Sequence, residues 1–237
     1  PKGCEKINIM KKVVLAYSGG LDTSYCLKYL KNEKGYEVHT VLINTGGFDE
    51  AELAAIEKRA YDLGSAQHAN LTIVEKYYDK AIKYLIYGNV LKNNTYPLSV
   101  SAERVFQAIE AIKYAKSVGA EAIAHGSTGA GNDQIRFDLI FQTIAPEIEI
   151  ITPIRDLKLS RQEEVDYLAK NGVHYSWEKA QYSINKGLWG TSVGGKETLT
   201  SHQALPSEAY PSQLSKEGEE KVTLEFKKGE LVAVNGK

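Results

Sequence analysis

The stretch VVLAYSGGLDTS, residues 13–24, joins a continuous apolar run directly to a serine and two glycines. Such a run is typical of a parallel strand that is covered on both faces, and the small residues after it indicate a tight turn into a helix. Because Ser18, Gly19 and Gly20 have little or no side chain, consecutive amides and the dipole of the next helix can meet one anion. The stretch therefore predicts a strand, an anion-binding loop and a helix, in that order.

Apolar runs alternate with helical patterns over roughly the first 170 residues, which predicts an α/β fold with a doubly wound, parallel five-stranded sheet. The expected strands are Val13–Tyr17, Val38–Asn44, Ala69–Val74, Ala122–His125 and Ile148–Ile151. The expected helices are Leu21–Lys31, Glu50–Leu63, Ala81–Asn89, Ala102–Ser117, Asp133–Ile144 and Arg161–Lys170. After these, Tyr175–Glu208 shows no clear period and predicts a long ordered loop or a linker.

The pattern predicts two units along the chain. Residues 1–172 are expected to form a nucleotide-binding domain, and residues 173–237 a linker and the start of a second, α+β domain. Residues 221–237 predict a β-hairpin around Lys228 and Gly229. An isolated hairpin is marginal in water, so we expect the chain to stop inside the second domain. Residues 1–9 precede the single methionine, Met10, and are expected to be an extension.

Composition favours small-molecule partners. The formal net charge of -1 and the pI near 6.6 supply no basic face for nucleic acid, and no apolar run is long enough to span a membrane. Without a secretory signal, we expect a cytoplasmic protein. The two cysteines, Cys4 and Cys26, and the histidines show no metal-ligand spacing, so no protein-bound metal centre is predicted.

The first loop has the residue types that suit a nucleotide. Ser18, Thr23 and Ser24 add hydroxyl groups to the bare amides, and Asp22 could hold a magnesium ion that bridges phosphate oxygens. The loop lacks the lysine of a GxxxxGK[ST] motif, which indicates a cradle for the β and γ phosphates as a leaving group, with AMP and pyrophosphate as products. The alternative is a plain turn with Asp22 as a helix cap.

A second loop, HGSTGAGNDQIRFD, spans residues 125–138 and follows another predicted strand. Because parallel strands present their carboxyl ends on one edge, both loops should face the same crevice. Thr128, Asn132, Asp133 and Arg136 bring the acceptors, donors and positive charge that suit a small zwitterion. The alternative is a helix capped by Asn132 with a surface pair between Asp133 and Arg136.

AYSGGLDTS, residues 16–24, resembles the pyrophosphatase-type loop of the N-type ATP pyrophosphatases, and together with the second loop it is similar to argininosuccinate synthases. The resemblance implies an adenine nucleotide alpha hydrolase-like fold and a first domain of ATP pyrophosphatase type. It also implies ATP with Mg²⁺, and citrulline and aspartate as substrates joined to argininosuccinate through citrullyl-AMP in arginine biosynthesis. A homotetramer is implied for the full-length protein.

The resemblance also assigns residues, with Asp22 and Asp133 in catalytic roles. The implied nucleotide contacts are Ala16, Tyr17, Ser18, Gly19, Gly20, Leu21, Asp22, Thr23, Ser24, Ile43 and Gly126. The implied substrate contacts are Tyr96, Ser101, Thr128, Asn132, Asp133, Arg136, Ser183 and Ser192. Arg104 falls on a family arginine, whereas Pro97, Val100 and Glu103 depart from the commoner family pattern.

Two rival functions stay open from the residues alone. Another ATP pyrophosphatase, such as a transfer-RNA thiolase or an amidotransferase-linked synthetase, would share the first loop. A thiolase, however, should show working cysteines and a basic face for RNA. A non-catalytic nucleotide-binding module would also explain the first loop, but would leave the residues of the second loop without a task.

Overall fold

The computed structural model describes residues 10–175, 177 and 182–237. Its centre is a five-stranded, all-parallel sheet with strand order β3-β2-β1-β4-β5. The strands are β1 Lys12–Ala16, β2 Glu37–Asn44, β3 Gln67–Thr72, β4 Ala122–Ala124 and β5 Glu149–Ile151. The predicted doubly wound α/β fold is therefore confirmed.

The strand order reverses direction between β1 and β4. Leu15 in β1 pairs with Thr40 in β2 on one side and with Ala124 in β4 on the other. Successive connections leave β1 toward opposite edges, which opens a crevice beyond the carboxyl ends of these two strands. The segments that follow β1 and β4 therefore lie beside each other.

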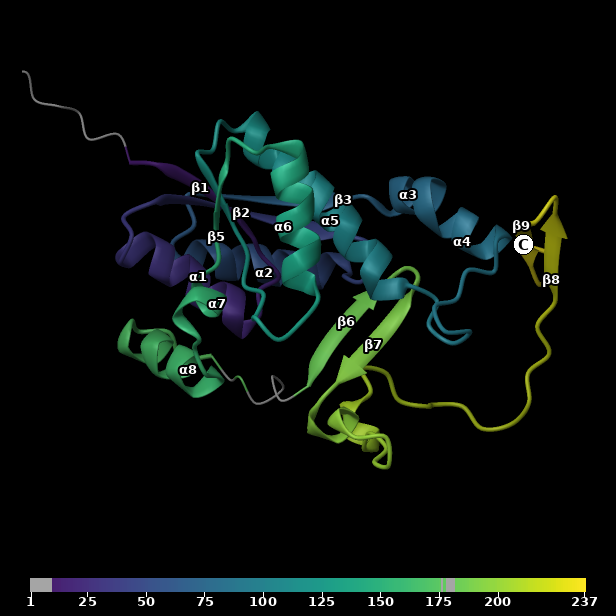
Figure 1. Cartoon of the computed structure of the whole chain (residues 1–237). Helices are drawn as coiled ribbons and strands as arrows, with labels where there is room; N and C mark the ends of the chain where they lie inside the picture. Colours follow the sequence, from purple (N-terminus) through teal and green to yellow (C-terminus); the bar gives the residue numbers. More distant parts are fainter. Residues whose placement is uncertain (1–9, 176, 178–181) are drawn as a thin grey trace, which may run out of the picture.

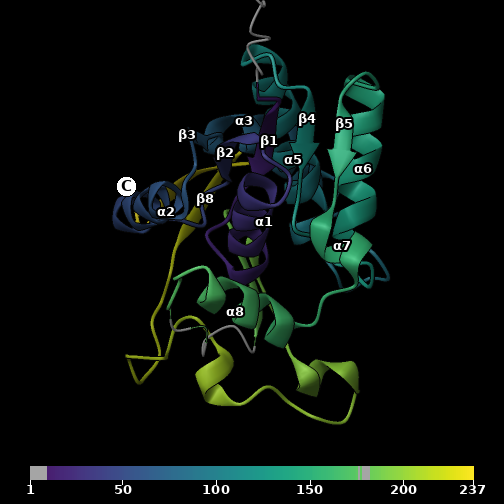
Figure 2. The same cartoon turned by 90° about the vertical axis from the view of Figure 1, so that its left-hand side faces the viewer.

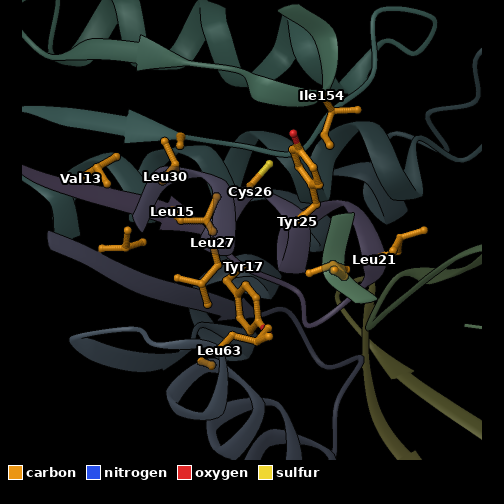
Figure 3. Close-up of a cluster of buried hydrophobic side chains, with 14 of the residues drawn as sticks. Val13, Leu15, Tyr17, Leu21, Tyr25, Cys26, Leu27, Leu30, Leu63 and Ile154 are labelled. Atoms are coloured by element: carbon orange, nitrogen blue, oxygen red, sulfur yellow. The ribbon is translucent and has the colours of Figure 1, made fainter. Parts of the chain in front are cut away.

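Helices cover both faces of the sheet (Figures 1 and 2). Packed on one face are α1 Leu21–Asn32, α2 Glu50–Leu63, α7 Pro153–Leu157 and α8 Arg161–Lys170. Packed on the other are α5 Ser99–Ser117 and α6 Asp133–Ile144. Strand β1 supplies both cores, because Val13 and Leu15 point to the first layer and Val14 to the second, all fully buried. Figure 3 shows the first core, with Leu27 and Leu30 of α1 packed near Leu15.

The predicted helix Glu50–Leu63 is confirmed at both ends. Asp49 and Glu52 form a complete capping box, and Gly64 closes the helix in the left-handed conformation with φ of 100°. These local signals are legible in the sequence, which explains why its bounds agree with the prediction.

The third strand begins two residues earlier than predicted, because its first residues are polar. His68 is buried, but a hydrogen bond of 2.7 Å between its Nδ1 and Thr40 Oγ1 satisfies it. The helix predicted at Ala81–Asn89 also begins earlier. It is built from α3 Val74–Tyr77, a π-helical turn η1 Tyr78–Ile82 and α4 Lys83–Tyr87. Helix α7 was not predicted, and α5 begins at Ser99 rather than Ala102.

The prediction of a loop or linker over Tyr175–Glu208 is wrong for part of that segment. Strands β6 Ser183–Gly187 and β7 Gly190–Gly194 form an antiparallel hairpin (Figure 1). Its turn residues are Leu188 and Trp189, which is not one of the Asn-Gly or Asp-Gly turns that signal a hairpin. The short helices η3 Lys196–Leu199 and η4 Ser207–Ala209 follow.

The hairpin predicted near the end of the chain is confirmed, with strands β8 Leu224–Lys227 and β9 Glu230–Val234. It lies beside α4, where the Tyr87 hydroxyl donates a hydrogen bond of 2.7 Å to Glu230 Oε1 (Figure 1). That this hairpin starts a second domain stays a prediction. Across the described ranges, no helix has the combination of length and apolar composition needed to cross a bilayer.

Candidate functional site

A cavity of about 710 Å³ opens at the carboxyl edge of β1 and β4. This volume is in the range of small-molecule sites. Its walls come from the two loops after β1 and β4, from α5, and from the β6 strand of the hairpin. The prediction that both loops face one crevice is thus confirmed by the fold.

The first loop is shaped by a glycine with a left-handed backbone. Gly19 has φ of +74°, and a Cβ there would lie 3.1 Å from Ile56 Cγ1 on α2. From the same helix, Arg59 Nη1 donates a hydrogen bond of 2.5 Å to the Gly19 carbonyl oxygen. The Arg59 guanidinium lies 4.9 Å from the centre of the Tyr175 ring, a cation–π distance. Helix α2 therefore fixes the backbone of this loop.

Helix α1 begins at the cavity without a side-chain cap. Gly20 is its N-cap residue and no side chain accepts from the first amides, whereas α2 and α8 both carry full capping boxes. Thr23 Oγ1 instead donates to the Gly20 carbonyl at 3.3 Å, and Asp22 lines the cavity. The alternative of a plain turn capped by Asp22 therefore loses support, since the amides stay open toward the cavity.

A buried carboxyl lies beside Asp22. Glu164 of α8 is 2% exposed, and burial, followed by the charge of Asp22, raises the pKa of Glu164 to about 8. At neutral pH the pair carries less negative charge than two carboxylates would. Below the loop, burial raises the pKa of the Tyr17 hydroxyl to about 12.

The second loop leads into α6, which also lacks a side-chain cap. Asn132 is the N-cap residue, but its side chain makes no capping hydrogen bond. The Asp133 carboxylate accepts from two arginines, at 2.6 Å from Arg136 Nη1 and at 3.0 Å from Arg104 Nε. Asp133 is therefore more than one half of a surface pair with Arg136, because Arg104 also connects it to α5.

Glu103 on α5 is a buried carboxylate that the sequence did not single out as a site residue. It is 4% exposed, and its Oε1 accepts from the Thr45 hydroxyl at 2.7 Å and from Gln107 Nε2 at 2.9 Å. Burial raises its pKa above the ordinary value. A Cβ added at Gly187 would lie 2.9 Å from Glu103 Oε2, so the hairpin backbone passes close to this carboxylate.

Three hydrogen bonds hold the β6–β7 hairpin against the cavity. Leu188 N donates to the Thr45 carbonyl at 2.9 Å, and Trp189 Nε1 donates to the Pro97 carbonyl at 2.6 Å. Arg104 Nη2 donates to Asn185 Oδ1. Backbone and side-chain bonds from the turn after β2, from α5 and from the segment before α5 therefore fix this hairpin.

Most of the predicted site residues line this cavity. From the nucleotide set these are Ala16, Tyr17, Ser18, Gly20, Leu21, Asp22, Thr23, Ile43 and Gly126. From the substrate set they are Thr128, Asn132, Asp133, Arg136 and Ser183. The roles assigned to them remain predictions.

Five predicted residues lie outside the cavity wall. Gly19 packs on Ile56, and Ser24 is fully buried in α1. The other three are Tyr96, Ser101 and Ser192. The Tyr96 hydroxyl accepts from Ser101 N at 3.1 Å, and Ser192 pairs with Asn185 across the hairpin.

Several wall residues were not predicted as part of the site. Among them are Phe48, Glu103, Gln107, His125, Arg161, Asn185 and Lys186. His125 carried a signal, since it borders the second loop in the sequence, and Asn185 and Lys186 lie between the predicted contacts Ser183 and Ser192. The others come from segments that the tertiary structure brings to the cavity, and the sequence offers no local motif for them.

A parallel sheet of this order, with two uncapped helices opening at its switch point, defines an α/β nucleotide-binding domain. The family model of the arginosuccinate synthase N-terminal HUP domain matches residues 12–174, more than half of the chain. The chain therefore belongs to the argininosuccinate synthase family.

Curated relatives carry the same family name. The chain is 41% identical over 226 residues to an argininosuccinate synthase of Methanocaldococcus jannaschii, covering 94% of this chain and 57% of the relative. It is 38% identical to the argininosuccinate synthase of Sulfolobus acidocaldarius, over 95% of this chain and 57% of the relative. The chain thus spans somewhat more than half the length of these relatives.

Proposed function

We propose that the chain is the nucleotide-binding part of an enzyme that joins citrulline and aspartate at the expense of ATP. The observation that carries the proposal is the convergence of two uncapped helix N-termini, α1 and α6, on one cavity. Uncapped amides and helix dipoles favour anions, so each loop is suited to a phosphate or a carboxylate. The family membership makes argininosuccinate synthesis the best-supported reaction.

In the proposed reaction the ureido oxygen of citrulline attacks the α-phosphorus of ATP. Citrullyl-AMP forms and pyrophosphate leaves, and the aspartate amine then displaces AMP to give argininosuccinate. The open amides from Gly20 to Thr23 stabilise the negative charge of the departing pyrophosphate. The backbone near Ile43 lies along the adenine, so the nucleotide spans the switch point.

The second loop and the hairpin hold the amino acids. Thr128, Asn132 and Asp133 orient the aspartate amine, and Asp133 is itself held between two arginines. A carboxylate can accept more than one hydrogen bond on each oxygen, so both pairs leave room for a ligand. The implied citrulline contacts are Tyr96, Ser101, Ser183 and Ser192, and Arg136 supplies a positive charge for a substrate carboxylate.

Magnesium fits the first loop by donor chemistry. The Asp22 carboxylate lines the cavity without capping α1, and the Ser18 and Thr23 hydroxyls lie 3.4 Å apart beside it. These are the oxygen donors that Mg²⁺ prefers. When bound with ATP, the ion would neutralise charge on the phosphate oxygens.

Exchange of labelled pyrophosphate into ATP tests the proposal, measured on this chain and on the full-length protein. We expect exchange that requires citrulline. Exchange without citrulline would instead favour another ATP pyrophosphatase, and ATP binding without exchange in the full-length protein would favour a non-catalytic module. A cytoplasmic homotetramer stays a prediction for the full-length protein, to be checked by its mass in solution.

A further inference from the structure

His125 directly follows β4, at the start of the second loop, and has no part in the reaction proposed above. It is 1% exposed, and its ring stacks on Phe137, with ring centres 5.4 Å apart and planes at 22°. Both ring nitrogens have partners. Nε2 lies 2.9 Å from Asp138 Oδ1, and Nδ1 lies 3.2 Å from the backbone nitrogen of Ser127.

These partners settle the protonation pattern of the ring. The Ser127 N–H can only donate, so Nδ1 must accept with its lone pair. Nε2 therefore carries the hydrogen in the neutral ring and donates it to Asp138. A bond to one nitrogen thus fixes what the other nitrogen can do.

Asp138 is held as a carboxylate by a second partner. Burial alone would raise its pKa, but hydrogen bonds from His125 and Arg155 outweigh burial and hold the pKa of Asp138 below its ordinary value. Arg155 Nη1 lies 2.6 Å from Asp138 Oδ2. The carboxylate is thus an acceptor for both neighbours and cannot donate to either.

The same arginine reaches the loop by another route. Arg155 Nη1 donates to Gln134 Oε1 at 3.1 Å, and Gln134 Nε2 donates to the Gly129 carbonyl at 2.7 Å. One network from α6 and α7 therefore holds the loop at Ser127 and at Gly129. Thr128 lies between these two points and lines the cavity.

We propose that Asp138, acting through the His125 tautomer, and Arg155, acting through Asp138 and Gln134, are positioning residues that hold Thr128 against the amino-acid substrate. The inference rests on the proposed function of the second loop. Its physical basis is that the hydrogen bonds of the network end on the backbone of this loop. Each connection is a directed bond, so a change at Asp138 should reach the loop without disturbing the sheet.

Asp138→Asn is the most direct test. His125 and Arg155 bond to different oxygens of Asp138, and an asparagine replaces one of these oxygens by an NH₂ group, so only one of the two positions can still accept. With its oxygen toward Arg155, the NH₂ faces Nε2, which must then accept, and the hydrogen moves to Nδ1. The Ser127 N–H then loses its acceptor. Asp156→Asn is the matched control. Asp156 is a second carboxylate near Arg155, with 3.6 Å between its Oδ1 and Arg155 Nε, but it is not bonded to His125.

Three measurements separate positioning from a purely structural role. Heteronuclear NMR of labelled imidazole should show the Nε2–H tautomer in the unchanged chain and its loss in Asp138→Asn. Amide exchange at Ser127 should become faster. Calorimetry should show that affinity for L-aspartate, with ATP present, falls by about tenfold, the effect of one hydrogen bond, while affinity for ATP stays within about twofold.

Two substitutions of His125 provide a rescue test. His125→Asn places an amide oxygen near the position of Nδ1 and can still accept from Ser127, whereas His125→Gln places its polar atoms near Nε2. Both remove the ring from Phe137, so they share the loss of packing. Asparagine should retain more of the Ser127 protection than glutamine.

The proposal is overturned if Asp138→Asn leaves the tautomer and the Ser127 exchange unchanged. It is also overturned if affinity for ATP and for aspartate fall equally, which would indicate a general structural role. If the full-length protein binds ATP but no aspartate, the proposed function fails. The tautomer and exchange measurements need no ligand, so they would still decide whether the network positions the loop.

Discussion

Gly47 lies in the turn after β2, against the backbone of the β6–β7 hairpin, and its replacement by alanine is the sharpest test of how that hairpin is held. A Cβ at Gly47 would lie 1.9 Å from the Lys186 carbonyl oxygen and 2.7 Å from its carbonyl carbon. Ordinary contacts between heavy atoms are about 3.5 Å, so the two backbones must separate by roughly 1.5 Å. Because the obstacle is main chain, no rotamer change can relieve it.

The protein can respond to Gly47→Ala in two ways, and both destabilise the docked hairpin by a similar free energy. Forcing an extra carbon into a packed site costs about 1–3 kcal/mol. If the hairpin lifts instead, it loses the bonds from Leu188 to Thr45 and from Trp189 to Pro97, each worth about 1 kcal/mol net. We therefore expect the undocked hairpin to become about 30-fold more populated, which corresponds to about 2 kcal/mol.

Amide hydrogen exchange with mass spectrometry measures this opening directly. Peptides covering residues 183–194 should exchange faster in Gly47→Ala, and the Leu188 amide should lose most protection. Gly194→Ala is the control, because a Cβ there would lie 3.8 Å from Thr198 Oγ1, an ordinary contact. Equal exchange in Gly47→Ala and the unchanged chain would refute the reasoning that the hairpin is docked at this point.

Three further predictions follow from the site. Arg59→Ala removes the charged donor from the Gly19 carbonyl and should weaken ATP binding by about 10- to 100-fold, and unchanged affinity in calorimetry would contradict this. Asp133→Ala should spare ATP binding but strongly slow product formation with aspartate in the full-length protein, and normal turnover would remove Asp133 from the site. The pKa of Glu164, about 8 in the fold, lies above the ordinary 4.5, so the native state keeps a proton that the unfolded chain releases, and stability falls as pH rises between these values. Glu164→Gln should therefore show a smaller fall in melting temperature between about pH 5 and pH 8, and parallel curves for both proteins would exclude this cause.

The two loops were predictable because their information is local. In VVLAYSGGLDTS and HGSTGAGNDQIRFD, the strand end, the glycines and the helix start follow one another within a few residues. The parallel sheet then requires that both loops meet at one edge, and the cavity lies there. The boundaries were poorer where polar residues are buried, as at His68 in β3.

The hairpin was not predictable by the same reasoning. Its strands SINKG and GTSVG have no alternating apolar pattern, and Leu188 and Trp189 are poor signals for a tight turn. They are held by contacts with Thr45, Pro97 and Arg104, which lie far away along the chain. No local window of sequence contains both partners of any of these bonds.

The sequence by itself determined the α/β sheet, the order of loop and helix after β1 and β4, and the residue types offered to an anion. The tertiary structure alone decided which distant side chains complete the cavity, including Glu103, Gln107 and Arg161. The physical reason is the range of the interactions. Strand pattern, turn and helix start depend on neighbours within a few residues, whereas buried carboxylates and docked hairpins depend on partners that only folding brings within hydrogen-bond distance.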